Sequence, residues 1–188
     1  MSKLMGNVEK LRELAEQLKF PDYNGFPDIE LYMDQVLDFL SRSRTSLRDD
    51  DRLSSAMVNN YIKADVLPRA RGKKYSREHL VHLSVILRLK QVLSVKDTGT
   101  LIKEDKQNRT DEEFYENFRS MIETSAKEIS GKVLSSDGNL PDIAMRMAVE
   151  SYLCKITSEY LIDMISGYDD DSYFNKATNG SNSDSKQI

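Results

Sequence analysis

Residues 67–80 carry the clearest chemical signal in the sequence. The segment LPRARGKKYSREHL places five cations in fourteen positions of a chain whose formal net charge is −4. Arg and Lys side chains that cluster in this way bind the oxygens of phosphate groups, although a run of surface charges is more often simply solvated. The five candidates for phosphate contacts are Arg69, Arg71, Lys73, Lys74 and Arg77.

The charge of the wider region favours a contact with a polyanion. Residues 42–90 hold twelve cations and five anions, whereas the remainder of the chain holds fifteen cations and 26 anions. A strongly basic module inside an acidic protein is the expected footprint of a contact with a phosphate backbone. The sequence therefore predicts a polyanion site in this region, and the net negative charge of the chain excludes general binding of nucleic acid over the whole surface.

The segment just before the basic run offers side chains that can read bases. LSSAMVNNYIKADVLP is predicted to form a short helix at residues 54–65, and a carboxamide at Asn59 or Asn60 can pair bidentately with adenine. Helix capping or plain surface polarity explains the two asparagines equally well. The two tyrosines nearby are expected mainly to pack, with their hydroxyls reaching outward. The candidate contacts from these segments are Ser55, Asn59, Asn60, Tyr61, Lys63 and Tyr75.

No set of residues suggests catalysis. The chain has no glycine-rich phosphate loop and no nucleophile elbow, and its two histidines, His79 and His82, fall on one predicted helix. Ordinary helix positions explain them better than a shared metal, because no cysteine lies nearby. Cys154 is expected to be a small core residue. We therefore expect no enzyme activity, no metal and no cofactor.

Length and composition indicate a soluble, cytoplasmic and all-helical protein. The 188 residues include four prolines, eight glycines, one cysteine and no tryptophan. No apolar run approaches the roughly 20 residues that a membrane span needs. A single cysteine cannot form an internal disulfide, which fits a reducing compartment. The only strand-like element that we expect is a short two-stranded ribbon at the basic turn.

Helical periodicity and capping residues organise the N-terminal half of the chain. An amphipathic helix is predicted at residues 8–18, and after a turn a second helix should be capped by Asp28. Ser54 or Ser55 should cap the next helix, and Pro68 should prevent it from continuing.

Four further helices are predicted after the basic segment. Ser76 should cap a long helix whose wide apolar face makes it central to the core. A short helix is expected at residues 96–103, although Gly99 weakens that expectation. EDKQNRTDEE should connect to a helix at residues 110–134, which opens with a capping-box pattern, and a last helix follows at residues 141–166 with a proline near its start.

The middle of the chain resembles the helix-turn-helix and short wing of MerR-type transcription regulators. LSSAMVNNYIKADVLP is followed by a basic turn, Tyr75 and a long helix, and VLP stands where that family has Leu-Leu-Pro. The sequence departs from the MerR pattern in several places. Asn59 replaces an arginine, Asp65 stands where glycine makes the left-handed exit from the helix, and the wing ARGKKY is short.

A more specific resemblance is to the mainly Firmicute bacterial family called domain of unknown function 1836. YMDQVLDFL, MVNNYIKADVLP and GKKYSREHLVHLSVILRLKQVLSV carry this similarity, which covers most of residues 28–165. The resemblance implies a bacterial helical protein with a MerR-like winged helix, and it implies no particular reaction or ligand.

These observations predict four parts and two alternative functions. Residues 1–27 should form an N-terminal helix and turn, residues 28–104 a MerR-like DNA-binding module, residues 105–167 a helical hairpin that forms a homodimer or holds a small effector, and residues 168–188 a disordered tail. The expected function is a transcription regulator that binds double-stranded DNA. The alternative is a protein-interaction module that keeps the winged-helix scaffold and recognises an acidic protein.

Overall fold

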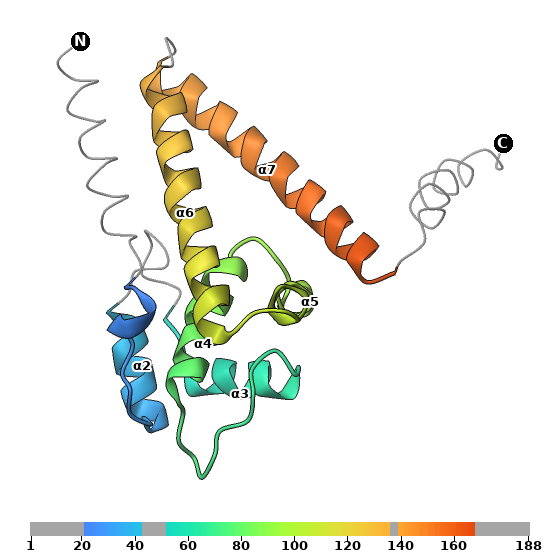
Figure 1. Cartoon of the computed structure of the whole chain (residues 1–188). Coiled ribbons are helices and arrows are strands. Elements are labelled where there is room, and N and C mark those ends of the chain that lie inside the picture. The colour runs from blue at the N-terminus through green and yellow to red at the C-terminus, as the bar shows by residue number, and fades with distance from the viewer. Residues whose placement is uncertain (1–20, 43–51, 136–138, 168–188) are drawn as a thin grey trace, which may run out of the picture.

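The computed structural model describes residues 21–42, 52–135 and 139–167, and these residues are helical with no strand among them (Figure 1). The prediction of an all-α fold is confirmed. The predicted helix at residues 8–18 and the predicted tail lie outside the described residues. The elements are η1 (Tyr23–Gly25), α2 (Met33–Ser41), α3 (Ser55–Lys63), α4 (Arg77–Leu89), α5 (Val95–Lys106), α6 (Asp111–Leu134) and α7 (Leu140–Ile165).

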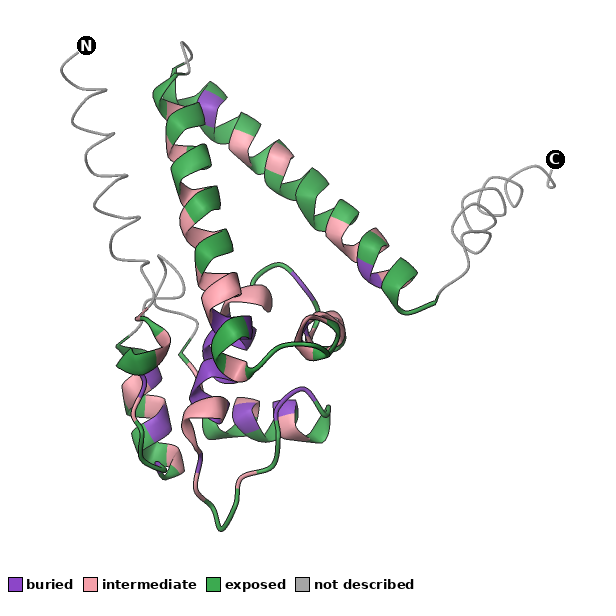
Figure 2. Ribbon diagram, viewed as in Figure 1, coloured by how far each residue is buried: buried purple, intermediate pink, exposed green. Residues whose placement is uncertain are grey.

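Helix α4 is the centre of the core, as its wide apolar face predicts. Every residue from His79 to Leu87 is buried. Helices α2, α5 and the start of α6 pack directly against α4, and α3 adds Val58 and Tyr61 to the same apolar cluster. Figure 2 shows that buried residues concentrate where these helices meet.

The first turns of α6 belong to this core as well. Phe114 and Tyr115 are buried, and the Tyr115 hydroxyl donates a hydrogen bond to the Pro21 carbonyl at 2.8 Å. The ring of Phe26 packs edge-on against Tyr115 with centroids 5.0 Å apart. Helix α5 extends to Lys106, so the connection before α6 is shorter than EDKQNRTDEE. The predicted division of the chain into four parts stays a prediction.

Local capping chemistry sets several helix starts where the sequence predicts them. The Ser54 hydroxyl accepts from the Met57 amide at 3.3 Å, and Ser76 is the N-cap of α4. Thr110 and Glu113 form the predicted capping box of α6, which satisfies two amide groups that the first turn of a helix leaves without partners.

The predicted cap of the second helix is wrong. Helix α2 begins at Met33, and its N-cap is Tyr32, whose amide donates to the side-chain oxygen of Gln35 at 2.9 Å. The carboxylate of Asp28 lies instead 3.3 Å from the guanidinium of Arg77 at the start of α4. Between Asp28 and the start of α2, Leu31 exchanges backbone hydrogen bonds with Tyr75, so the helix starts later than local reasoning predicts.

Helix α6 ends close to the start of α7, and the two helices diverge from there (Figure 1). The two buried residues of α7 are Ile143 and Ile162, near its two ends, and α7 also packs against α5. The prediction that Cys154 is a core residue is wrong, because this cysteine is exposed on α7. Among the described residues, no helix has the length and apolarity that crossing a membrane requires.

Candidate nucleic-acid interface

The end of α3 is set by a residue in the left-handed conformation. Asp65 has φ 58°. The Val66 amide donates to the Tyr61 carbonyl at 2.9 Å, and the Asp65 amide donates to the Ile62 carbonyl at 3.2 Å. These two bonds make a Schellman motif, and the burial of Tyr61 and Val66 holds it in place.

Helix α3 turns its apolar side inward and its polar side outward. Val58 and Tyr61 are buried, and at about 100° per residue the opposite side presents the polar positions. All four of the predicted polar contacts on this helix are exposed. They are Ser55, Asn59, Asn60 and Lys63.

The two predicted tyrosine contacts have a different environment. Tyr61 is 3% exposed and Tyr75 is 5% exposed. Burial raises the pKa of the Tyr75 hydroxyl, as expected when the charged phenolate loses water. Packing, which the sequence favours for both residues, is thus their role in the described structure.

The basic segment between α3 and α4 forms a tight turn. Arg71 and Lys74 exchange backbone hydrogen bonds of 3.1 and 3.0 Å, and the two residues between them, Gly72 and Lys73, have φ values of 57° and 66°. Positive φ at both central residues is the signature of a type I′ hairpin turn. The predicted ribbon is thus reduced to an isolated antiparallel bridge. We call residues 69–74 the basic hairpin.

A second backbone bridge fixes the base of the basic hairpin. The Leu31 amide donates to the Tyr75 carbonyl at 2.9 Å, and the Tyr75 amide donates to the Leu31 carbonyl at 2.8 Å. Both side chains are buried in the core. The basic hairpin is therefore attached to the segment that precedes α2 as well as to α4.

The five predicted phosphate ligands divide into two groups. Arg69, Arg71 and Lys73 are exposed on the basic hairpin, and none of them has an acidic partner among the described residues. Lys74 lies 4.0 Å from a Glu30 carboxylate oxygen and 5.7 Å from the centre of the Tyr32 ring. The first three cations are therefore the ones that the structure leaves available.

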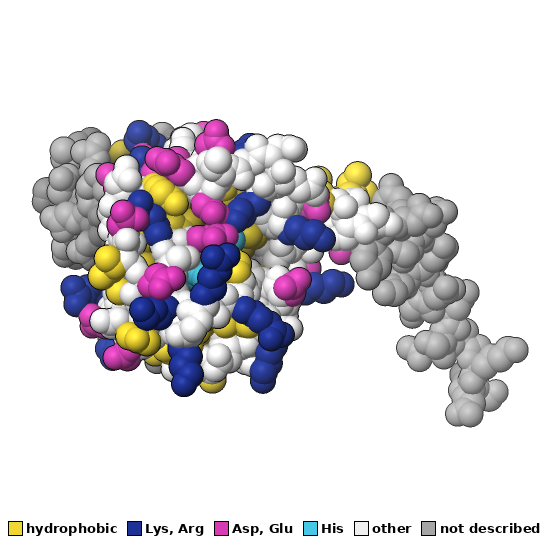
Figure 3. Space-filling view, turned by 60° about the horizontal axis from the view of Figure 1, so that its bottom comes forward, with side chains coloured by type: hydrophobic (Ala, Val, Ile, Leu, Met, Phe, Trp, Pro, Cys, Tyr) yellow, Lys and Arg dark blue, Asp and Glu magenta, His cyan; other side chains and the backbone are white. Residues whose placement is uncertain are grey.

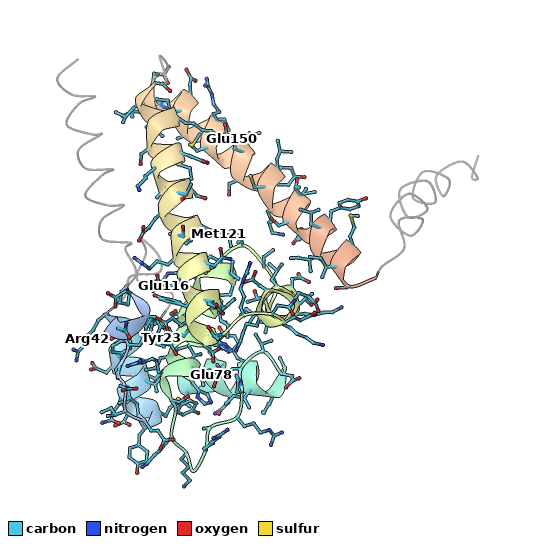
Figure 4. The ribbon with its side chains drawn as sticks, viewed as in Figure 1. Tyr23, Arg42, Glu78, Glu116, Met121 and Glu150 are labelled. Atoms are coloured by element: carbon cyan, nitrogen blue, oxygen red, sulfur yellow. The ribbon has the colours of Figure 1, made fainter. Side chains whose placement is uncertain are left out.

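Arg77 is held by the protein itself. Its guanidinium pairs with Asp28 and also lies over the ring of Tyr23, 5.3 Å from the ring centre. Figure 4 labels Tyr23, which lies at η1 near the start of α6. The side chain of Arg77 is 21% exposed. These contacts give Arg77 a structural role at the start of α4.

His79 contacts the base of the basic hairpin, and the sequence did not predict this contact. Its Nδ1 accepts from the Ser76 amide at 3.1 Å, so the other ring nitrogen, Nε2, carries the proton and faces the Arg69 carbonyl at 3.4 Å. Burial lowers the pKa of His79, and the hydrogen bond to Arg69 partly opposes this effect. The available signal was the spacing of Ser76 and His79, which matches that of a capping box.

His82 belongs to a separate polar cluster between α4, α5 and α6. Its Nε2 lies 2.9 Å from the ammonium of Lys106 and 3.2 Å from a carboxylate oxygen of Asp111. Lys106 also forms an ion pair with Asp111 and lies 3.6 Å from Glu78. Hydrogen bonds from His82 and Lys106 hold the pKa of Asp111 at about 2.

The same cluster has the side chains of a metal site. Ligand atoms of Glu78, His82 and Asp111 lie within 4.8 Å of one another. However, the Lys106 ammonium contacts all three residues. Its positive charge therefore already offsets the negative charge of these carboxylates. His79 and His82, which sequence reasoning considered as a pair, have different partners.

Figure 3 views the molecule from the side on which α3 and the basic hairpin lie. Lys and Arg side chains spread across this face, with acidic side chains among them. The surface is thus basic at the hairpin and mixed in charge around it.

The fold and this face define a small helical protein that presents a short polar helix beside a basic hairpin. The chain belongs to the family described as domain of unknown function (DUF1836), whose model matches residues 21–123. The matched segment runs from η1 into α6, so it includes the whole candidate interface. Comparisons with curated proteins and with solved structures find no match.

Proposed function

We propose that this protein binds double-stranded DNA and regulates transcription. The exposed side of α3 would enter the major groove, where Asn59 and Asn60 read base edges. The basic hairpin would contact the phosphate backbone beside the groove. The protein acts as a binding protein in this proposal, without catalysis and without a cofactor.

One observation carries the proposal. The polar side of α3 is exposed, and the chain leaves α3 directly into a hairpin whose Arg69, Arg71 and Lys73 are exposed without acidic partners among the described residues. Surface cations that are not paired within the protein can release counterions from DNA when they bind phosphate. A base-reading helix next to backbone-contacting groups is one of the arrangements by which DNA-binding proteins recognise sequence.

The finer form of the proposal is a MerR-like winged helix-turn-helix. It is supported by the left-handed exit at Asp65, by the hairpin that follows α3, and by the long helix α4 that anchors the hairpin. Helix α2 ends at Ser41 and α3 begins at Ser55, so more residues separate the two helices than in the tight turn of MerR proteins.

Reversing two charges of the basic hairpin tests the phosphate contacts. Arg71→Glu with Lys73→Glu should weaken binding to all DNA sequences, and the slope of log K against log salt should become shallower by about 2. The measurement is a salt titration by fluorescence anisotropy. Lys103→Glu with Lys127→Glu makes the same charge change at exposed positions on α5 and α6, and it should alter affinity much less. Equal effects of the two double variants would remove the hairpin from the proposal.

Truncating the asparagines tests base reading separately. Asn59→Ala with Asn60→Ala should reduce the free-energy difference between specific and non-specific binding by about 1–3 kcal/mol for each base contact that is lost. Target sequences for this comparison would come from genome-wide binding of the tagged protein. An unchanged ratio would show that α3 does not read bases.

A protein partner is the second candidate. Asn59 in place of an arginine, together with a sequence pI of about 5.3, favours recognition of an acidic protein by this face. Recovery of no DNA in the genome-wide experiment, together with a protein that co-purifies at low salt, would favour this function.

A further inference from the structure

We propose that a second copy of this chain packs against the outward side of α7. Five large apolar side chains form one stripe along this helix, and we call them the outer stripe of α7. They are Met145, Val149, Tyr152, Leu153 and Ile156. This inference concerns a different part of the molecule from the DNA-binding proposal and does not rest on it.

The outer stripe lies on the side of α7 that faces away from the rest of the chain. At about 100° per residue, Val149 and Ile156 are each roughly 120° or more around the helix from the buried Ile143 and from the buried Ile162. Residues of the stripe are 44–67% exposed. The described part of the chain therefore uses the other side of α7 for its own packing.

Apolar exposure is concentrated on this arm of the molecule. Twelve of the fifteen large hydrophobic residues that are exposed in the described structure lie on α6 beyond its core contacts or on α7. Figure 4 shows how far these helices extend from the core, with Met121 and Glu150 labelled along them. A long helix with an uncovered apolar side is marginal in water and is normally stabilised by packing.

The size of the outer stripe fits one helical partner. Its five side chains leave on the order of 500 Å² uncovered, and a stable interface buries about 800 Å² on each partner. The aliphatic stems of flanking charged side chains supply the remaining area when they lie along an apolar surface. One further helix of the same length, about 40 Å, would cover the whole stripe.

The charges beside the stripe favour an identical partner. Arg146 and Glu150 lie on one flank, and Lys155 and Glu159, which form an ion pair, lie on the other. Each flank carries one cation and one anion, and Glu150 also pairs with Lys132 of α6. A two-fold interface, in which the same patch meets itself, therefore brings no excess of like charge together. DNA or an acidic protein would find no excess of positive charge here.

The rest of this chain is a poorer candidate to cover the stripe. Residues 168–188 are mostly Ser, Asn, Asp and Gly and offer few apolar side chains. The N-terminal segment leads into Pro21, whose carbonyl accepts a hydrogen bond from the Tyr115 hydroxyl near the start of α6. In Figure 1, η1 and α7 lie on opposite sides of α6. A second α7 is therefore the occupant that the composition and the geometry favour.

The test compares two single charges on the same helix. Sedimentation of the full chain without DNA should give a mass near twice 21.6 kDa. Val149→Glu, in the stripe, should weaken dimerisation at least about tenfold because the dimer would bury unpaired carboxylates. Ser151→Glu, at an exposed position on the side of α7 that also carries Ile162, should leave the mass unchanged. Both positions are exposed in a single chain, so helix content by circular dichroism should stay the same.

Two results would overturn the inference. One is a wild-type protein that sediments as a monomer at every concentration tested. The other is a Val149→Glu variant that dimerises as strongly as Ser151→Glu. Because no DNA is present, neither result depends on whether α3 and the basic hairpin bind DNA.

Discussion

His79 holds the base of the basic hairpin through both nitrogens of its ring. One nitrogen accepts from the Ser76 amide and the other faces the Arg69 carbonyl, so only the neutral ring satisfies both contacts. Burial lowers the pKa of this histidine below its ordinary value of about 6.5. Protonation of His79 would therefore remove its contact with the Ser76 amide.

The titration of His79 makes a prediction for stability against pH. Below about pH 6.5 the unfolded chain binds a proton at this position before the folded chain does, so the free energy of unfolding should fall as pH decreases from 7 to 5. His79→Gln keeps an acceptor for the Ser76 amide and removes the titration. Urea unfolding at pH 7, 6 and 5 should therefore give a shallower pH dependence in the variant. Identical slopes in the two proteins would show that His79 does not determine how the free energy of unfolding changes between pH 5 and 7.

Helix α5 shows how packing between elements overrides local preference. Gly99 weakens the expectation of a helix, yet α5 runs through it from Val95 to Lys106. A Cβ atom at Gly99 would lie 2.7 Å from the nearest side-chain carbon of Val66. Glycine thus allows α5 to approach the segment that leaves α3.

Two glycine replacements separate the effect of packing between helices from the effect of helix propensity. Gly99→Ala should destabilise the protein, because overpacking of about 1–3 kcal/mol outweighs the gain in helix propensity of about 1 kcal/mol. Gly131→Ala, in α6 where a Cβ would meet no atom within 4 Å, should stabilise it by up to about 1 kcal/mol. Denaturant midpoints would measure both changes. Stabilisation by both replacements would show that Val66 moves aside without cost.

At the scale of the whole molecule, the cluster of Lys106, Asp111 and His82 joins α4, α5 and the start of α6. The ion pair and hydrogen bonds of Asp111 lower its pKa to about 2. Its carboxylate is only 26% exposed, so solvent weakens these interactions less than it weakens surface pairs. The cluster therefore helps to hold α6 against the central helix.

Neutralising Asp111 should have an effect that depends on pH. The folded-state pKa lies below the unfolded value, so the stabilisation is present above about pH 4 and is lost as pH falls towards 2. Asp111→Asn should lower the free energy of unfolding by about 1–2 kcal/mol at pH 7, and the difference from wild type should shrink at pH 3. Asp105→Asn, which removes an exposed pair with Arg109, should cost less than about 0.5 kcal/mol. A constant difference across this pH range would contradict the assigned role.

The parts of the fold that follow from local chemistry were predictable. Ser54, Ser76 and the Thr110–Glu113 box cap helices through groups that are three residues apart. The left-handed Asp65 is likewise a local event. Asp28 was assigned wrongly because Leu31 forms a backbone bridge with Tyr75, which lies far away in the sequence, and α2 begins only after this bridge.

The candidate interface was predictable only in part for the same reason. Residue types and spacing identified the polar side of α3 and the cations of the basic hairpin. They did not show that Arg77 is held by Asp28 and Tyr23, or that His79 bonds to the hairpin. Each of these facts depends on a contact between segments that only folding brings together.

The sequence by itself determined the helical class, most helix starts and the concentration of positive charge around one short segment, because capping, periodicity and composition act over a few residues. Tertiary structure alone decided which cations stay available, why Gly99 is needed beside Val66, and that Cys154 is exposed. Apolar periodicity predicts that one side of α7 must be buried, but it does not identify the segment that covers this side. The uncovered outer stripe of α7 appears only when the other helices are in place.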